Sequence, residues 1–339
     1  MYDIELIKAM KKKIVLIGGG VGASTFTRAL KSLPLHLSTI VSTFDDGGST
    51  GAIRRDYRGI ALGDFRQCLF ASVDLDESVK KVLDYRFGRG NLYGVNVGNL
   101  LLKAFLQSAK TQRHGVLQFH KLLKMENAVI PVSYDYSRLC ARLTNNRVLT
   151  DQAQIQAYYS FSQAAIKSLY LSNTARLSPE GKSAMKNTDY LVFAPGNFFS
   201  SILPNLHVKG FAEEWKKSTA KKIFFFNLLA HRGQDSYYTL MNYLAWFQQR
   251  LGKKPFDIIV VNKKIANNIV RKVEDRFELT KITEEDKKSL KELGIEMHIA
   301  DLVSPVIRAQ PKNDTVLRAP LRHDTEKIQH FFKHILSVS

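Results

Sequence analysis

Short apolar runs alternate with amphipathic stretches along most of the chain, and glycine or asparagine ends many of them. Such runs are typical of strands that are buried on both faces of a parallel sheet, with helices between them. The runs occupy residues 14–17, 38–43, 129–132, 190–193, 223–226, 258–261 and 296–300. This alternation predicts an α/β fold with a Rossmann-like, doubly wound and mostly parallel sheet. No internal repeat or linker interrupts it, so we expect one domain over residues 1–339, with a mixed helical insertion at roughly 74–187.

A glycine-rich turn follows the first run, and Gly18, Gly20 and Ala23 have the G-x-G-x-x-A spacing of a dinucleotide or phosphate turn. The helix expected to begin here would offer unpaired N–H groups and a positive dipole end to a phosphate. No Lys-Ser/Thr pair follows, so the turn is not a Walker A loop. The residues predicted to contact phosphate here are Gly18, Gly19, Gly20 and Gly22.

The stretch from Phe44 to Arg66 carries the densest group of polar and glycine residues. Asp45 and Asp46 follow the second run, and Gly47, Gly48 and Ser49 come directly after them. Carboxylates beside such a loop can hold a metal, accept from a ribose hydroxyl or act as a base, whereas an Asp-capped turn is the structural alternative. Asp64 begins the next expected helix, as its N-cap or as a ligand group.

In a parallel sheet the loops after successive strands share one edge, so both glycine-rich loops are expected to face one crevice. Further along the chain, polar groups also follow the runs at 190–193 and 223–226. They are Gly196, Asn197 and Asn227.

The composition of the chain limits the classes of ligand and partner that we expect. The net charge of +19 and the pI near 9.8 favour anionic ligands. The lysines are scattered in pairs and no nucleic-acid module is visible, so nucleic acid is the least favoured partner. Cys68 and Cys140 form no disulfide framework or metal pattern, and no apolar stretch is long enough to cross a bilayer. We therefore expect a cytoplasmic protein without a membrane span.

Several motifs, in this order along the chain, resemble the YvcK-type gluconeogenesis factor family. That family belongs to the superfamily of the 2-phospho-L-lactate transferase CofD. The matching segments are residues 17–22, 45–51, 63–69, 98–102, 194–196, 201–206, 227–229 and 322–325. The chain departs from the family pattern at Val95 and in the loops 197–200 and 229–235. Phosphate contacts are therefore expected to carry over better than sugar or base specificity.

The resemblance implies a Rossmann-like fold and a cytoplasmic protein that binds a nucleotide-sugar such as UDP-N-acetylglucosamine. It also implies a role in cell shape or envelope growth on gluconeogenic carbon sources. Arg322 is the candidate contact to a diphosphate, because a guanidinium can bind it with two hydrogen bonds. An ion pair with Asp324 or another acid is its structural alternative. The other residues assigned to nucleotide or phosphate binding are Gly47, Gly48, Ser49, Arg66, Asn99, Gly196, Asn197 and Asn227.

The alternative is a CofD-like transferase that moves a phospho-organic acid from a nucleotide diphosphate carrier to an alcohol. Mg²⁺ would then offset the diphosphate charge, with Asp45 as its ligand and Asp46 or Asp64 as the base. Whether the protein is an enzyme stays open, and non-enzymatic ligand binding is the favoured interpretation. Homo-oligomer formation also stays open.

Overall fold

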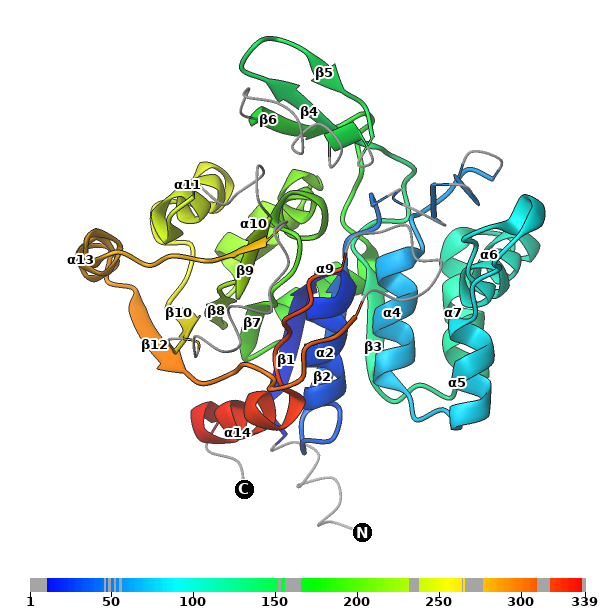
Figure 1. Ribbon diagram of the computed structural model, residues 1–339, viewed down its shortest axis with the longest axis horizontal. Coiled ribbons are helices and arrows are strands. Elements are labelled where there is room, and N and C mark those ends of the chain that lie inside the picture. Colours follow the sequence, from blue (N-terminus) through cyan, green and yellow to red (C-terminus); the bar gives the residue numbers. More distant parts are fainter. Residues whose placement is uncertain are drawn as a thin grey trace.

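A seven-stranded parallel sheet forms the centre of the protein, in the order β12-β10-β8-β7-β1-β2-β3 (Figure 1). The computed structural model describes residues 11–45, 47, 50–51, 53–54, 57–151, 154–155, 166–231, 238–263, 265, 277–309 and 318–336. The strands are β1 (Lys13–Gly18), β2 (His36–Val41), β3 (Ala128–Pro131), β7 (Tyr190–Phe193), β8 (Lys221–Phe225), β10 (Ile258–Asn262) and β12 (Glu296–Ala300). Each strand coincides, within a few residues, with a predicted apolar run, and the doubly wound α/β fold is confirmed.

The strand order reverses between β1 and β7. Strands β2 and β3 extend the sheet on one side of β1, whereas β7, β8, β10 and β12 extend it on the other. Ligands of such sheets bind beyond the carboxyl ends of the strands at this reversal. The loops after β1 and β7 are therefore the expected walls of a site.

Successive residues of β1 feed two different cores, because side chains of a strand alternate between the faces of its sheet. Ile14 and Leu16 pack with Phe26 and Phe332, whereas Val15 and Ile17 pack with a core that contains Trp215. The helices of the first core are α2 (Gly20–Leu30), α4 (Gly63–Ser72), α6 (Val97–Ser108), α7 (Gln112–Leu122) and α14 (Thr325–Leu336). Those of the second are α9 (Pro179–Lys186), α10 (Phe211–Lys217), α11 (Leu240–Leu251) and α13 (Glu284–Glu292), with the short helices η2 (Phe198–Ile202) and η3 (Leu203–His207).

The region predicted as an insertion contains a small sheet beside several helices. The three-stranded antiparallel sheet is made of β4 (Leu139–Leu143), β5 (Val148–Leu149) and β6 (Ile166–Leu171), and it projects from one end of the molecule (Figure 1). The short helices α5 (Glu77–Asp84) and η1 (Gly90–Leu92) precede α6. The strand β3 also lies in this range and pairs with β2, so part of the region belongs to the central sheet.

The C-terminal segment returns to the first core. Gln329 of α14 donates to the Ala29 carbonyl of α2 at 3.0 Å and to Ser32 Oγ at 2.8 Å. The chain before α14 runs past α2 (Figure 1). A second small sheet pairs β9 (Leu229–His231) with β11 (Phe277–Leu279) in antiparallel register. None of the helices in the described residues is long and apolar enough to cross a membrane.

Candidate functional site

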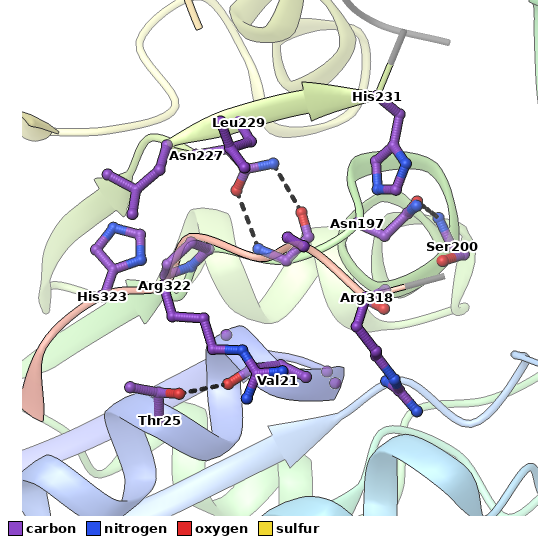
Figure 2. Close-up of a pocket in the computed structure, with 18 of the residues that line it drawn as sticks. Val21, Thr25, Asn197, Ser200, Asn227, Leu229, His231, Arg318, Arg322 and His323 are labelled. Carbon is purple, nitrogen blue, oxygen red and sulfur yellow. Dashed lines mark hydrogen bonds between the residues drawn. The ribbon is translucent and has the colours of Figure 1, made fainter. Parts of the chain in front are cut away.

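A cleft opens at the carboxyl ends of the central strands, where the strand order reverses. Its walls are the loops after β1, β7 and β8 and the segment that precedes α14 (Figure 2). It encloses about 150 Å³, whereas one water needs about 10–15 Å³ of such space. The cleft therefore has room for an organic ligand rather than for a single ion.

The glycine turn after β1 forms the first wall. Gly19 precedes α2 in extended conformation, no side chain caps the helix, and its first turn contains no acidic residue. The first N–H groups of α2 are thus left for an anion, and the helix dipole adds positive potential there. A Cβ at Gly22 would overlap the carbonyl oxygen of Pro195, and Gly20 has a φ of +62°. Glycine is required here because the loops after β1 and β7 touch.

The loops after β7 and β8 form the opposite wall and are joined by Asn227. Its Oδ1 accepts from the Gly196 N–H at 3.0 Å, and its Nδ2 donates to the Gly196 carbonyl at 2.8 Å. Asn197 caps the next turn, since its Oδ1 accepts from the Ser200 N–H at 3.0 Å. That turn, η2, is a π-helical segment, a local form that is frequent at functional sites.

Two carboxylates face the cleft. Asp64 Oδ2 accepts from Ser201 Oγ at 2.8 Å, and burial raises the pKa of Asp64 despite that bond and the nearby Arg318. The interpretation of Asp64 as an N-cap is wrong: Leu62 precedes α4, and the carboxylate lies in the first turn beneath the glycine turn. Asp45 Oδ1 accepts from the Gly47 N–H at 2.9 Å, which is an Asp-stabilised turn beside the cleft.

Arginines from the C-terminal segment bring positive charge to the same space. Figure 2 shows Arg322 extending toward Val21 in the first turn of α2, with Arg318 on the other side of the cleft. Within the part of the chain that the structure describes, Arg322 forms no ion pair, and its buried Nε has no hydrogen-bond partner. Burial and the neighbouring Arg308, Arg318 and Arg28 lower the pKa of Arg322 to about 10. Asp324 instead accepts from N–H groups in the first turn of α14, so it is not the partner of Arg322.

Rings and apolar side chains line the rest of the cleft. The rings of His231 and Phe277 lie 4.7 Å apart between centroids, and Leu229 lies nearby. Burial lowers the pKa of His231 to about 4 and that of His323 to about 3, so both histidines are neutral at pH 7. The end of the cleft with His231, Phe277 and Leu229 therefore suits a ring rather than a phosphate.

Most predicted site residues with described positions meet in this cleft. The predicted residues that line it are Gly19, Gly20, Gly22, Asp45, Asp64, Gly196, Asn197, Asn227 and Arg322. Gly18 ends β1 just before the turn, and Gly47 packs against Asp45 without lining the cleft. Asp46, Gly48 and Ser49 lie outside the described residues.

Arg66 and Asn99 do not line the cleft. Arg66 is buried and forms a salt bridge with Asp84 at 2.7 Å. Asn99 is buried in the first turn of α6, where its N–H donates to Oδ1 of the N-cap residue Asn96 at 3.1 Å. Arg66 therefore links α4 to the end of α5, whereas Asn99 belongs to the capped start of α6.

Sequence reasoning did not assign several lining residues, namely Thr25, Ser201, His231, Phe277, Arg318 and His323. Ser201 and His323 stand inside motifs that resemble the family, and this was the only signal available for them. Arg318 and Phe277 enter the cleft only through the path of the folded chain.

The donor set is compatible with one kind of metal site. Among the described residues, no three His, Cys, Asp or Glu side chains gather to hold an ion. Mg²⁺, however, is commonly held by one or two carboxylates together with the phosphates of a ligand. Asp45, at the cleft, fits that role.

Comparisons with known proteins agree with the fold and the motifs. Residues 14–303 match the family model described as 2-phospho-L-lactate transferase CofD. The gluconeogenesis factor of Bacillus subtilis is 31% identical over 329 residues, which cover 96% of this chain and 98% of that protein. A putative gluconeogenesis factor of Pasteurella multocida is 33% identical over 251 residues, covering 74% of this chain and 80% of that protein. The crystal structure of a UPF0052 family member from Bacillus halodurans superposes with a TM-score of 0.84 at 27% identity, covering 95% of this chain and 98% of that one. The chain therefore belongs to the CofD family, among its gluconeogenesis factors.

Proposed function

We propose that the cleft binds a nucleoside diphosphate-sugar of the UDP-sugar class and that the protein acts as a ligand-binding regulator. One observation carries this proposal: the guanidinium of Arg322, which has no carboxylate partner among the described residues, faces the uncapped first turn of α2. Burying a cation beside free helix N–H groups costs free energy unless an anion neutralises the charge and accepts from those groups. A diphosphate supplies that charge, and its oxygens match the guanidinium.

The two ends of the cleft bind different parts of the ligand. The glycine turn and Arg322 take the diphosphate, whereas the end with His231, Phe277 and Leu229 takes a ring of the nucleoside or the sugar. The neutral His231 suits the second end, because it donates and accepts hydrogen bonds without adding charge.

The biological role that we propose follows the relatives that are named gluconeogenesis factors. Ligand occupancy would report the supply of nucleotide-sugar in the cytoplasm and adjust envelope growth and cell shape on gluconeogenic carbon sources. Such a role requires binding but no turnover.

Calorimetric titration tests the proposal directly. UDP-N-acetylglucosamine is expected to bind more tightly than UMP, because UMP lacks the second phosphate, and the affinity should fall as salt is raised. Absence of both heat and thermal stabilisation with every UDP-sugar would overturn it.

A transferase is the second candidate, because Asp45 and Asp64 line the same cleft. When bound, Mg²⁺ would neutralise diphosphate charge. Asp45 would hold it, and Asp64 would accept the proton of an attacking alcohol. Asp45→Asn should then abolish metal-dependent turnover of a nucleoside diphosphate carrier while nucleotide binding persists. Loss of binding without any turnover in the parent protein would leave only the binding role.

A further inference from the structure

A second groove lies outside the nucleotide cleft, between Ile53 and Tyr57 on one side and the helices η1 and α6 on the other. It encloses about 380 Å³, which is within the ~300–1,000 Å³ range of small-molecule sites. None of its lining residues lines the nucleotide cleft. Apolar side chains dominate its walls, namely Ile53, Tyr57, Leu92, Val95, Leu100 and Ala104.

One cationic side chain, that of Lys103, lies among these apolar walls. Lys103 is only 6% exposed, and its Nζ donates to the Arg58 carbonyl at 2.9 Å and lies 6.0 Å from the centroid of the Tyr57 ring. No carboxylate of the described residues pairs with it. Burial and the nearby Arg54 lower the pKa of Lys103, as expected for an ammonium without a counter-charge.

A lysine is almost never buried to this degree unless a negative group compensates it. An ammonium has three donors, and the Arg58 carbonyl uses only one of them. Among the described residues, the groove thus combines an apolar surface with a cation that no carboxylate neutralises. Each of these two features disfavours a class of ligand. A purely apolar molecule would add no negative charge beside Lys103, whereas a polyanion would place most of its charge against apolar walls.

We propose that this groove binds a monomeric amphiphile that has an apolar chain and one anionic head, the chemistry of a fatty carboxylate. The carboxylate would pair with Lys103, and the chain would lie along Leu92, Val95 and Leu100. Tyr57 and Leu92 at the rim are 55% and 42% exposed, so an apolar chain would cover them. A second copy of this protein is disfavoured as the occupant, because each chain carries a net charge of +19.

Calorimetry with decanoate below its micellar concentration tests this site on the full chain, with 1-decanol as the neutral probe of equal chain length. Decanoate should bind about tenfold or more tightly than decanol, because only decanoate pairs with the ammonium. Lys103→Met keeps the apolar stem and should remove that advantage while decanol affinity stays unchanged. Lys81→Met, the same change at an exposed lysine of α5, should alter neither affinity. Equal affinities for the two probes, or no binding of decanoate, would overturn the proposal.

Ala104→Phe provides a test that does not depend on the stability of a buried variant, since Ala104 is exposed at the groove. The new ring should fill the groove and abolish binding of both probes, and retained decanoate affinity would contradict the proposal. Arg322→Met should leave decanoate binding unchanged, and its loss would place the probe in the nucleotide cleft instead. Binding to anionic vesicles without binding of free decanoate would equally count against a monomer site.

Discussion

The side-chain amide of Asn227 pairs with the backbone of Gly196 through two reciprocal hydrogen bonds of 3.0 and 2.8 Å. The amide therefore continues the pairing of β7 and β8 beyond the last residues of both strands. It fixes one wall of the nucleotide cleft while leaving the neighbouring loop residues open to a ligand. The shape of this wall of the cleft therefore depends on the side chain of Asn227 rather than on backbone pairing between β7 and β8.

Asn227→Asp tests that role. The aspartate keeps an acceptor for the Gly196 N–H but faces the Gly196 carbonyl with a second oxygen, so one bond becomes a repulsion. We expect a loss of about 1–2 kcal/mol in the free energy of unfolding, measured with urea, and weaker UDP-sugar binding. Asn187→Asp is the matched control, because the side-chain amide of Asn187 donates to the Ser183 carbonyl at the exposed C-terminal end of α9. Equal losses in the two variants would remove any special role for Asn227.

Gly22→Ala tests the contact between the loops after β1 and β7. The added methyl group would overlap the Pro195 carbonyl, which is backbone and cannot rotate away. Overpacking of this kind costs about 1–3 kcal/mol, and displacement of the turn should also reduce nucleotide affinity. Gly181→Ala, in the first turn of α9, meets side-chain atoms only and should cost less. Thermal melts and titrations of both variants make the comparison.

Arg322→Met should reduce affinity for UDP-sugars about ten- to a hundredfold, since hydrogen bonds to charged groups contribute about 1.5–3 kcal/mol. Arg322→Lys keeps the charge without the two-pronged geometry and should fall between the parent and the methionine variant. Arg142→Met at an exposed position of β4 changes the net charge equally. If Arg142→Met weakens binding as much, the attraction is a general charge effect and Arg322 makes no direct contact.

Stability should fall in mild acid, in part through His323. Its pKa is near 6.5 when unfolded and about 3 in the folded protein, so only the unfolded chain takes up the proton in between. The contribution of the neutral, buried His323 to the free energy of unfolding is therefore fully present above pH 6.5. It is lost as the pH falls toward 3, by at most about 1.4 kcal/mol for each pH unit. His323→Phe should therefore lose less stability than the parent protein between pH 6.5 and 4.5 in urea titrations. Parallel pH profiles would show that His323 is already protonated in the folded state.

The central sheet was predictable because its signal is local. The inner strands β1, β7, β8 and β10 are mostly apolar runs buried on both faces, and such a run stands out wherever it occurs in the fold. The glycine turn was predictable for a similar reason, since its spacing reflects a local backbone geometry. The chemistry at the ends of β1, β7 and β8 followed once the strands were placed.

Side-chain partners far apart in sequence were not predictable. The pairing of Arg66 with Asp84, rather than with a ligand, depends on how α4 packs against its neighbours. Asp64 was interpreted as an N-cap or as a ligand group, but its hydrogen-bond partner Ser201 lies 137 residues further along the chain. Arg318 and His323 reach the cleft because the chain returns past α2, and no local pattern specifies that path.

That return has a consequence for the time at which the protein becomes able to bind. During synthesis the glycine turn emerges early, whereas the lining residues of the segment 318–323, which include Arg318, Arg322 and His323, are added after all the others. The helix α14, which ties this segment to α2, comes later still. A nascent chain can therefore fold most of its sheet on the ribosome, domain cores forming as they emerge, without a competent cleft. Ligand capture is thus delayed until translation has passed the segment that carries these arginines.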